Sequence, residues 1–138
     1  MAPEKDTIVD IPPNRIRYFG GPGKMLLPSP ATVAAVIKKV PARRLITTDL
    51  LRKTLTAQFE VQGTCPVTTL KALQVLAHDP RQKVAYWRVV NATGGLNSRY
   101  PGGAEGQAAL LRQEGIEVET SGKAPKVKQF RERLVRFK

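Results

Sequence analysis

The spacing of apolar residues predicts three short helices in the first half of the chain. The first begins at Ser29-Pro30, because serine caps helices and proline suits the first helical position, and Pro41 ends it. The second follows the cap signal Thr47-Thr48-Asp49, and the third lies within Cys65–Pro80. The apolar residues at helical spacing are Val33, Val36, Ile37 and Val40, then Leu51, Leu55 and Phe59, then Leu70, Leu73, Leu76 and Ala77.

The stretch Lys83–Gly103 has a different pattern. An apolar run, Val84-Ala85-Tyr86-Trp87, leads into Arg88-Val89-Val90, whose β-branched residues suit a short strand. Asn91–Gly95 has the composition of a tight turn, because asparagine and glycine accept positive φ. We therefore expect a hairpin here, followed by a fourth helix over Gly103–Glu114.

Together these elements predict a small α+β domain of the winged-helix type. Three helices, the last two joined by a tight loop, form a helix-turn-helix core, and the hairpin forms its wing. A terminal strand at Ile116–Glu119 completes the domain, which we place at residues 29–120. Residues 1–28, rich in proline and glycine, predict an irregular N-terminal arm.

The remaining residues, 121–138, form a basic C-terminal extension. Val127, Phe130, Leu134 and Phe137 recur at spacings of 3, 4 and 3, which predicts an amphipathic helix over Lys126–Lys138. The sequence leaves open whether this helix docks on the domain or lies along DNA.

The net charge of the chain indicates the class of partner that it binds. The chain has 138 residues and a formal net charge of +12, which favours a polyanion, most simply nucleic acid. A ribosomal or membrane-surface protein could share that balance. No apolar run approaches the ~20 residues of a membrane span, and no signal-peptide pattern opens the chain. The single cysteine excludes an internal disulfide, so we expect a cytoplasmic protein.

The motif around the hairpin resembles a known family. Arg88-Val89-Val90, Tyr100 and Gly102-Gly103 are similar to the DNA-binding domain of alkylguanine-DNA alkyltransferases, whose active site reads Pro-Cys-His-Arg-Val. The nucleophilic cysteine falls on Tyr86, and the histidine that activates it falls on Trp87. Without a thiolate there is no alkyl acceptor. The resemblance therefore implies the alkyltransferase-like, non-enzymatic branch, in which tryptophan commonly replaces that cysteine.

The resemblance also implies which residues meet DNA. In the family, the segment equivalent to Cys65–Pro80 is the recognition helix, which faces the minor groove. Two groups that assist base flipping in the family are replaced here, the tyrosine by Thr48 and the arginine by Leu70. The candidate nucleic-acid-binding residues are Thr48, Thr68, Thr69, Lys71, Gln74, Tyr86, Trp87, Arg88, Tyr100, Gly102 and Gly103.

Several of these residues have two readings. Tyr86 and Trp87 could form a stacking wall for an unpaired or alkylated base, or they could be core residues on a buried strand. Arg88 could bind DNA or hold the hairpin through backbone carbonyls, and we favour the second interpretation. Gly102-Gly103 could offer free amides to a phosphate or only begin a helix.

The expected function is non-enzymatic binding of double-stranded DNA, extending to recognition of alkylated guanine in repair. One alternative is an active alkyltransferase that uses Cys65. Another is a winged-helix module that binds protein or RNA. We expect a monomer that could recruit repair proteins, with no cofactor, metal or membrane contact. His78 has no neighbours at metal-ligand spacing.

Overall fold

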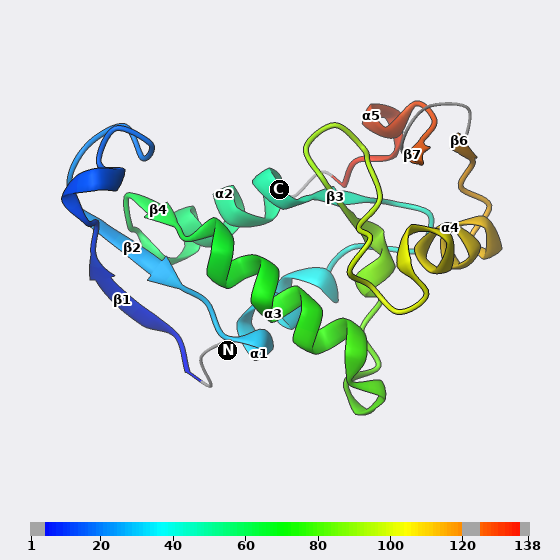
Figure 1. Cartoon of the computed structure of the whole chain (residues 1–138), viewed down its shortest axis with the longest axis horizontal. Coiled ribbons are helices and arrows are strands. Elements are labelled where there is room, and N and C mark those ends of the chain that lie inside the picture. Colours follow the sequence, from blue (N-terminus) through cyan, green and yellow to red (C-terminus); the bar gives the residue numbers. More distant parts are fainter. Residues whose placement is uncertain (1–4, 120–124, 136–138) are drawn as a thin grey trace.

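Three helices form the centre of the fold, as the apolar spacing predicts. Ser29 caps the first, because its Oγ accepts a hydrogen bond of 3.3 Å from the Thr32 amide. Thr47 caps the second, accepting a hydrogen bond of 3.3 Å from the Leu50 amide. The computed structural model describes residues 5–119 and 125–135, and in it these helices are α1 (Pro30–Ile37), α2 (Thr48–Phe59) and α3 (Pro66–His78) (Figure 1).

The buried face of α3 is shifted from the predicted one. Thr69 is 1% exposed and Ala72 is fully buried, whereas Leu70 is 41% exposed. Because α1 packs against α3, the small side chains of α3 suit that close contact and the bulkier Leu70 points outward. The prediction that Leu70 lies on the inner face is wrong, and so is the placement of Thr69 on the DNA-facing side. The buried residues of α3 are Thr69, Ala72, Leu73, Leu76 and Ala77.

A parallel pair of short strands joins the two halves of the chain. β3 (Ile46–Thr47) pairs with β5 (Val89–Val90). The short strand predicted at Arg88-Val89-Val90 is present as β5, and the residues before it, Tyr86–Arg88, form a 3-10 turn. After the turn at Asn91–Gly95 the chain continues as a loop. Among the described residues no strand pairs with β5 across that turn, so the wing is a loop and not a β-hairpin.

The N-terminal segment forms a sheet where the sequence predicts an irregular arm. β1 (Thr7–Asp10) runs antiparallel to β2 (Lys24–Leu27), and β2 pairs in parallel with β4 (Gly63–Thr64). The prediction of an irregular arm is therefore wrong for both strands. The runs of apolar residues in these strands are too short to show a periodic pattern. In addition, β2 pairs with β4, which lies much later in the sequence.

The described part of the C-terminal extension, residues 125–135, docks on the domain. β6 (Val118–Glu119) pairs with β7 (Lys126–Val127), and a four-residue helix, α5 (Phe130–Arg133), follows. The prediction of one helix from Lys126 is therefore wrong over the described residues. Val135, only 8% exposed, reaches the main hydrophobic core.

The fourth predicted helix is confirmed as α4 (Gly103–Gln113). Figure 1 shows the N-terminal sheet at one end of the molecule, α4 and the C-terminal elements at the other, and α3 crossing the front between them. Within residues 5–119 and 125–135, no helix is both long and apolar enough to cross a membrane. Further 3-10 turns lie at Pro13–Arg15 and Pro80–Gln82.

Candidate nucleic-acid interface

A cleft of about 540 Å³ opens between α3 and the segment that begins with β5. Thr48, at the start of α2, also lines it. Among the described residues around the cleft, Lys71 and Arg99 are basic and none is acidic. The cleft therefore suits an anionic or neutral ligand and disfavours a cationic one.

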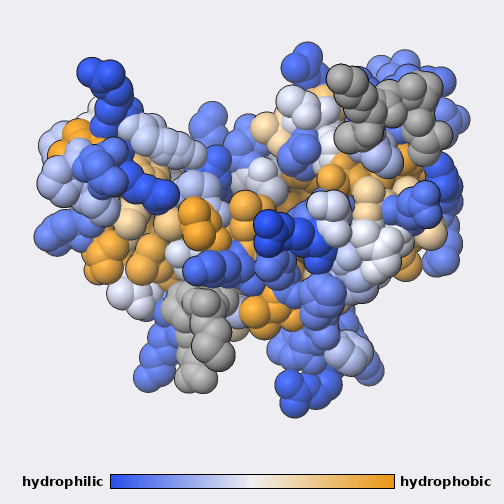
Figure 2. Space-filling model, in the orientation of Figure 1, coloured by the Kyte–Doolittle hydropathy of each residue, from blue (hydrophilic) through white to orange (hydrophobic). Residues whose placement is uncertain are grey.

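One wall of the cleft is the outer face of α3. Its residues Val67, Leu70, Lys71 and Gln74 follow one another at helical spacing and all line the cleft. Val67 is 46% exposed and Leu70 is 41% exposed, so this wall combines apolar surface with a cation. Figure 2 shows hydrophobic side chains among strongly hydrophilic ones along the front of the molecule, over α3.

The opposite wall is a loop held by its own side chains. Asn91 Oδ1 accepts hydrogen bonds from the amides of Thr93 and Gly95, at 3.0 and 2.7 Å. Gly94 has φ +87°, and a Cβ there would lie 2.6 Å from Cδ1 of Phe130. Only glycine fits that site, because the backbone is left-handed and the docked C-terminal segment covers it.

Buried Gln107, on α4, fixes both ends of this loop. Its Nε2 donates to the carbonyls of Trp87 and Val89, each at 2.9 Å. Its Oε1 accepts from the Asn97 amide at 2.7 Å. Three hydrogen bonds from one fully buried side chain thus set the distance between β5 and the far end of the loop. Sequence reasoning missed Gln107, because a single glutamine on a helix carries no signal of burial.

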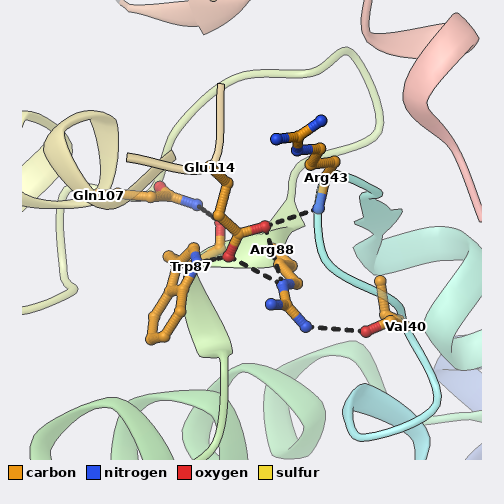
Figure 3. Close-up of polar contacts among 6 residues, drawn as sticks. All are labelled: Val40, Arg43, Trp87, Arg88, Gln107 and Glu114. Atoms are coloured by element: carbon orange, nitrogen blue, oxygen red, sulfur yellow. Dashed lines mark hydrogen bonds and ion pairs between the residues drawn. The ribbon is translucent and has the colours of Figure 1, made fainter. Parts of the chain in front are cut away.

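A polar cluster holds the aromatic motif in place (Figure 3). Trp87 Nε1 donates to Glu114 at 2.6 Å, and Arg88 Nε donates to Glu114 at 3.0 Å. Arg88 also donates to the Val40 carbonyl at 2.8 Å, and the Arg43 amide donates to Glu114 at 2.8 Å. The side chains of Arg88 and Glu114 are only 17% and 13% exposed.

The pKa of Glu114 reflects this cluster. Burial raises the pKa of the carboxyl, but hydrogen bonds from Arg43, Trp87 and Arg88 favour the charged form more strongly and hold the pKa below its ordinary value. Glu114 is therefore a charged anchor for the motif.

Three residues of the motif, Tyr86, Trp87 and Arg88, do not line the cleft. Trp87 and Arg88 are bound to Glu114, as described above. Tyr86 packs edge-on against Tyr100, with ring centroids 5.0 Å apart, and against Trp87 at 5.3 Å. Tyr86 and Trp87 are half-buried and do not line the cleft. They lie on a 3-10 turn and not on a buried strand, with Tyr86 packed against the main core and Trp87 against the cluster that contains Val90 and Leu111.

The other candidate residues divide between the cleft and the core. Tyr100 lines the cleft but is 3% exposed, and its hydroxyl donates inward to the Val89 carbonyl at 3.4 Å. Burial raises the pKa of Tyr100 above its ordinary value. Gly102 is the N-cap of α4 and Gly103 is its first residue, with φ values of +78° and +68°. Thr68 lies at the start of α3, outside the cleft.

Four residues of the loop wall that lie beyond the predicted turn at Asn91–Gly95 were missed by sequence reasoning. They follow the strand and have no periodic signal, although asparagine and serine are common in turns. Of these, Asn97 is held by Gln107, and the Arg99 carbonyl is within 2.9 Å of His78 Nε2 at the end of α3. The missed residues are Leu96, Asn97, Ser98 and Arg99.

Cys65, the alternative nucleophile, is buried at the N-terminus of α3 beneath the N-terminal sheet. Its pKa is lowered: burial raises it, but hydrogen bonds from Thr68, Val67 and Arg15 outweigh burial. The thiol is 5% exposed and does not line the cleft. Burial of this kind shields the thiol from a large alkylated base in this conformation. Within the described residues, no group of three or more potential metal ligands is present.

Two solved structures share this fold. One is the S. pombe ATL protein in complex with DNA, with a TM-score of 0.60 and 18% identity. The other is S. pombe Atl1 in complex with damaged DNA containing O6-carboxymethylguanine, with a TM-score of 0.59 and 20% identity. In each comparison the matched region covers 78% of this chain and 94% of the S. pombe chain. No protein-family model and no curated protein matches the sequence. The prediction of an alkyltransferase-like fold is confirmed.

Proposed function

We propose that this protein binds duplex DNA through the outer face of α3 and the adjoining cleft, and that it recognises alkylated guanine there without accepting the alkyl group. The observation that carries the proposal is the lining of the cleft. It has two cations and no acid among the described residues, apolar surface beside them, and no thiol.

The two S. pombe structures support this proposal, because both hold DNA on the same fold. The charge of the chain supports it independently: 23 basic residues face 11 acidic ones. An excess of this size favours a polyanion, since each neutralised phosphate releases counterions.

The apolar part of the cleft gives a reason for alkyl recognition. Val67, Leu70 and Leu96 contribute carbon surface to the lining. An alkyl group that enters from water would be buried against them, and each buried CH₂ is worth about 0.8 kcal/mol. A plain guanine lacks that gain.

The first prediction concerns phosphate contacts. Affinity for a plain duplex, measured by fluorescence anisotropy, is expected to fall steeply between about 50 and 200 mM salt. Lys71→Ala is expected to weaken binding to all sequences and to flatten the log–log salt slope by about one unit, because one phosphate contact is lost. Lys39→Ala is the matched control, since Lys39 is exposed and follows α1, which covers the buried face of α3. An equal effect of both changes would contradict the placement of DNA on α3.

The second prediction concerns the alkyl group. Affinity is expected to rise about fourfold from guanine to O6-methylguanine, and about fourfold again to O6-ethylguanine, since each step buries about 0.8 kcal/mol of hydrocarbon. Leu70→Ala is expected to reduce that gain, whereas Val75→Ala should not, because Val75 is 43% exposed on the same helix but outside the cleft. Mass spectrometry should find the chain unmodified. Equal affinity for all three duplexes, or an alkyl adduct on Cys65, would refute the proposal.

A further inference from the structure

A second hollow, of about 420 Å³, lies between the N-terminal loop and α2. Its lining includes Tyr18 and Phe19 from the loop, Arg52 and Lys53 from α2, and Gln62 and Gly63 beside β4. Nothing in the motif or the cleft accounts for this surface.

Tyr18 is an exposed aromatic ring that is held in position. It is 54% exposed, yet its ring packs edge-on against Phe19 with centroids 4.9 Å apart. Its hydroxyl accepts a hydrogen bond of 3.1 Å from Arg52. An aromatic ring with fixed orientation loses little entropy when a ligand stacks on it.

Phe19 is itself anchored to the body of the protein. Gln62 Nε2 donates to the Phe19 carbonyl at 2.7 Å. A Cβ on Gly63 would lie 2.2 Å from the Phe19 ring, so the ring rests directly on the backbone of β4. The N-terminal loop is thus fixed against α2 and β4, and the Tyr18 ring is pre-organised.

The charge of the hollow suits a phosphate-bearing ligand. Arg52 and Lys53 line it, and Asp49 is the single acid among its described lining residues. The neighbouring Arg17 is also exposed. Aromatic rings beside cations are the usual means by which proteins bind unpaired nucleotides, because bases stack and phosphates pair.

The hollow and the cleft are two separate depressions that are both lined by residues of α2. Thr48 lines the cleft, whereas Arg52 and Thr56 line the hollow. These residues are four apart and share one face of the helix, with a rise of about 6 Å per step. Since DNA rises 3.4 Å per nucleotide along each strand, the hollow lies about two to four nucleotides from the cleft.

We propose that this hollow is a second DNA subsite, which takes an unpaired nucleotide on the Tyr18 ring with its phosphate on Arg52 and Lys53. The subsite rests on the proposed function, because its strand is the one that occupies the cleft. The protein would therefore prefer a lesion whose flanking strand is single-stranded over the same lesion in continuous duplex.

The test uses three DNAs: an O6-methylguanine duplex, and two versions with a three-nucleotide gap that starts two base pairs from the lesion, on its 5′ or its 3′ side. Wild-type protein is expected to bind one gapped DNA about tenfold more tightly than the duplex. Tyr18→Ala should abolish this gain and leave duplex affinity unchanged. Tyr18→Phe, which keeps the ring, should retain most of it.

The outcomes separate the subsite from the cleft. Lys71→Ala should weaken binding to all three DNAs, because all of them occupy the cleft. If the wild-type protein binds none of the three DNAs, the proposed function itself is refuted. If the protein binds duplex DNA but neither gap raises affinity, or if the gain survives Tyr18→Ala, the subsite is refuted and the cleft stands. Loss of the gain in Tyr18→Phe as well as in Tyr18→Ala would show that the hydroxyl and not the ring is needed, and this also overturns the subsite.

Discussion

A chain that ends at Ser121 is expected to be unfolded at 25 °C, because the segment it lacks completes the hydrophobic core. Val127 is 2% exposed and Val135 is 8% exposed, and Phe130 and Leu134 are partly buried beside them. Each fully buried side chain of this kind contributes about 1.5–3 kcal/mol. The combined loss is about 5–10 kcal/mol, against a total stability of about 5–15 kcal/mol for a domain.

Backbone hydrogen bonds add to that loss. The Leu45 amide donates to the Arg133 carbonyl at 2.8 Å, and the Val135 amide donates to the Leu45 carbonyl at 2.7 Å. Leu45 lies directly before β3, and the Val127 amide donates to Gly94 at 2.9 Å. The extension therefore holds both the strand pair and the loop wall of the cleft.

Circular dichroism and thermal melting measure this effect. The matched control is the full-length chain with Lys128→Ala and Arg131→Ala, which removes exposed charges and leaves the apolar residues in place. That control should melt near the wild-type temperature. A truncated chain that melts with the same cooperativity as the wild type would show that the extension does not belong to the core.

Glu114→Leu is expected to destabilise the protein by about 3–5 kcal/mol, the usual cost of removing one partner of a buried ion pair. The change leaves Arg88 with the Val40 carbonyl alone and leaves the indole of Trp87 without its acceptor. Glu117→Leu is the matched control. Its ion pair with Lys128 is 3.7 Å long and exposed, so its loss should cost at most about 1 kcal/mol.

The pH dependence follows from the lowered pKa of Glu114. Its stabilising effect is complete above the ordinary value of 4.5 and is lost as pH falls below 4.5 through the lower pKa of the folded state. The stability difference between wild type and Glu114→Leu should therefore shrink in that acid range and stay constant above it. Urea unfolding at several pH values measures both. A difference that grows on acidification, or equal costs for the two variants, would contradict the buried pair.

Local signals in the sequence were sufficient to predict the central helices. Ser29 and Thr47 cap α1 and α2 through contacts three residues away, and such contacts depend on little beyond the local chain. The motif around Arg88 and Gly102-Gly103 was sufficient for the fold, which the S. pombe structures confirm.

The site was harder to predict from the sequence, because the burial of a side chain depends on which distant segments of the chain pack against it. The apolar spacing predicts that Leu70 is a core residue. In the structure α1 packs against the small side chains of α3, and Leu70 is therefore exposed. The motif predicts that Trp87 and Arg88 contact DNA. Only the tertiary structure shows that both side chains donate hydrogen bonds to Glu114, at the end of α4.

The sequence by itself therefore determined the order of the central helices, their caps, the basic charge and the family of folds. Each of these depends on residues within a few positions of one another or on composition alone. The tertiary structure decided which face of α3 is exposed, which segments close the cleft, and that residues 7–27 and 125–135 pack on the domain. Those features depend on contacts between distant segments, such as β2 with β4 and Leu45 with Val135, which no local period encodes.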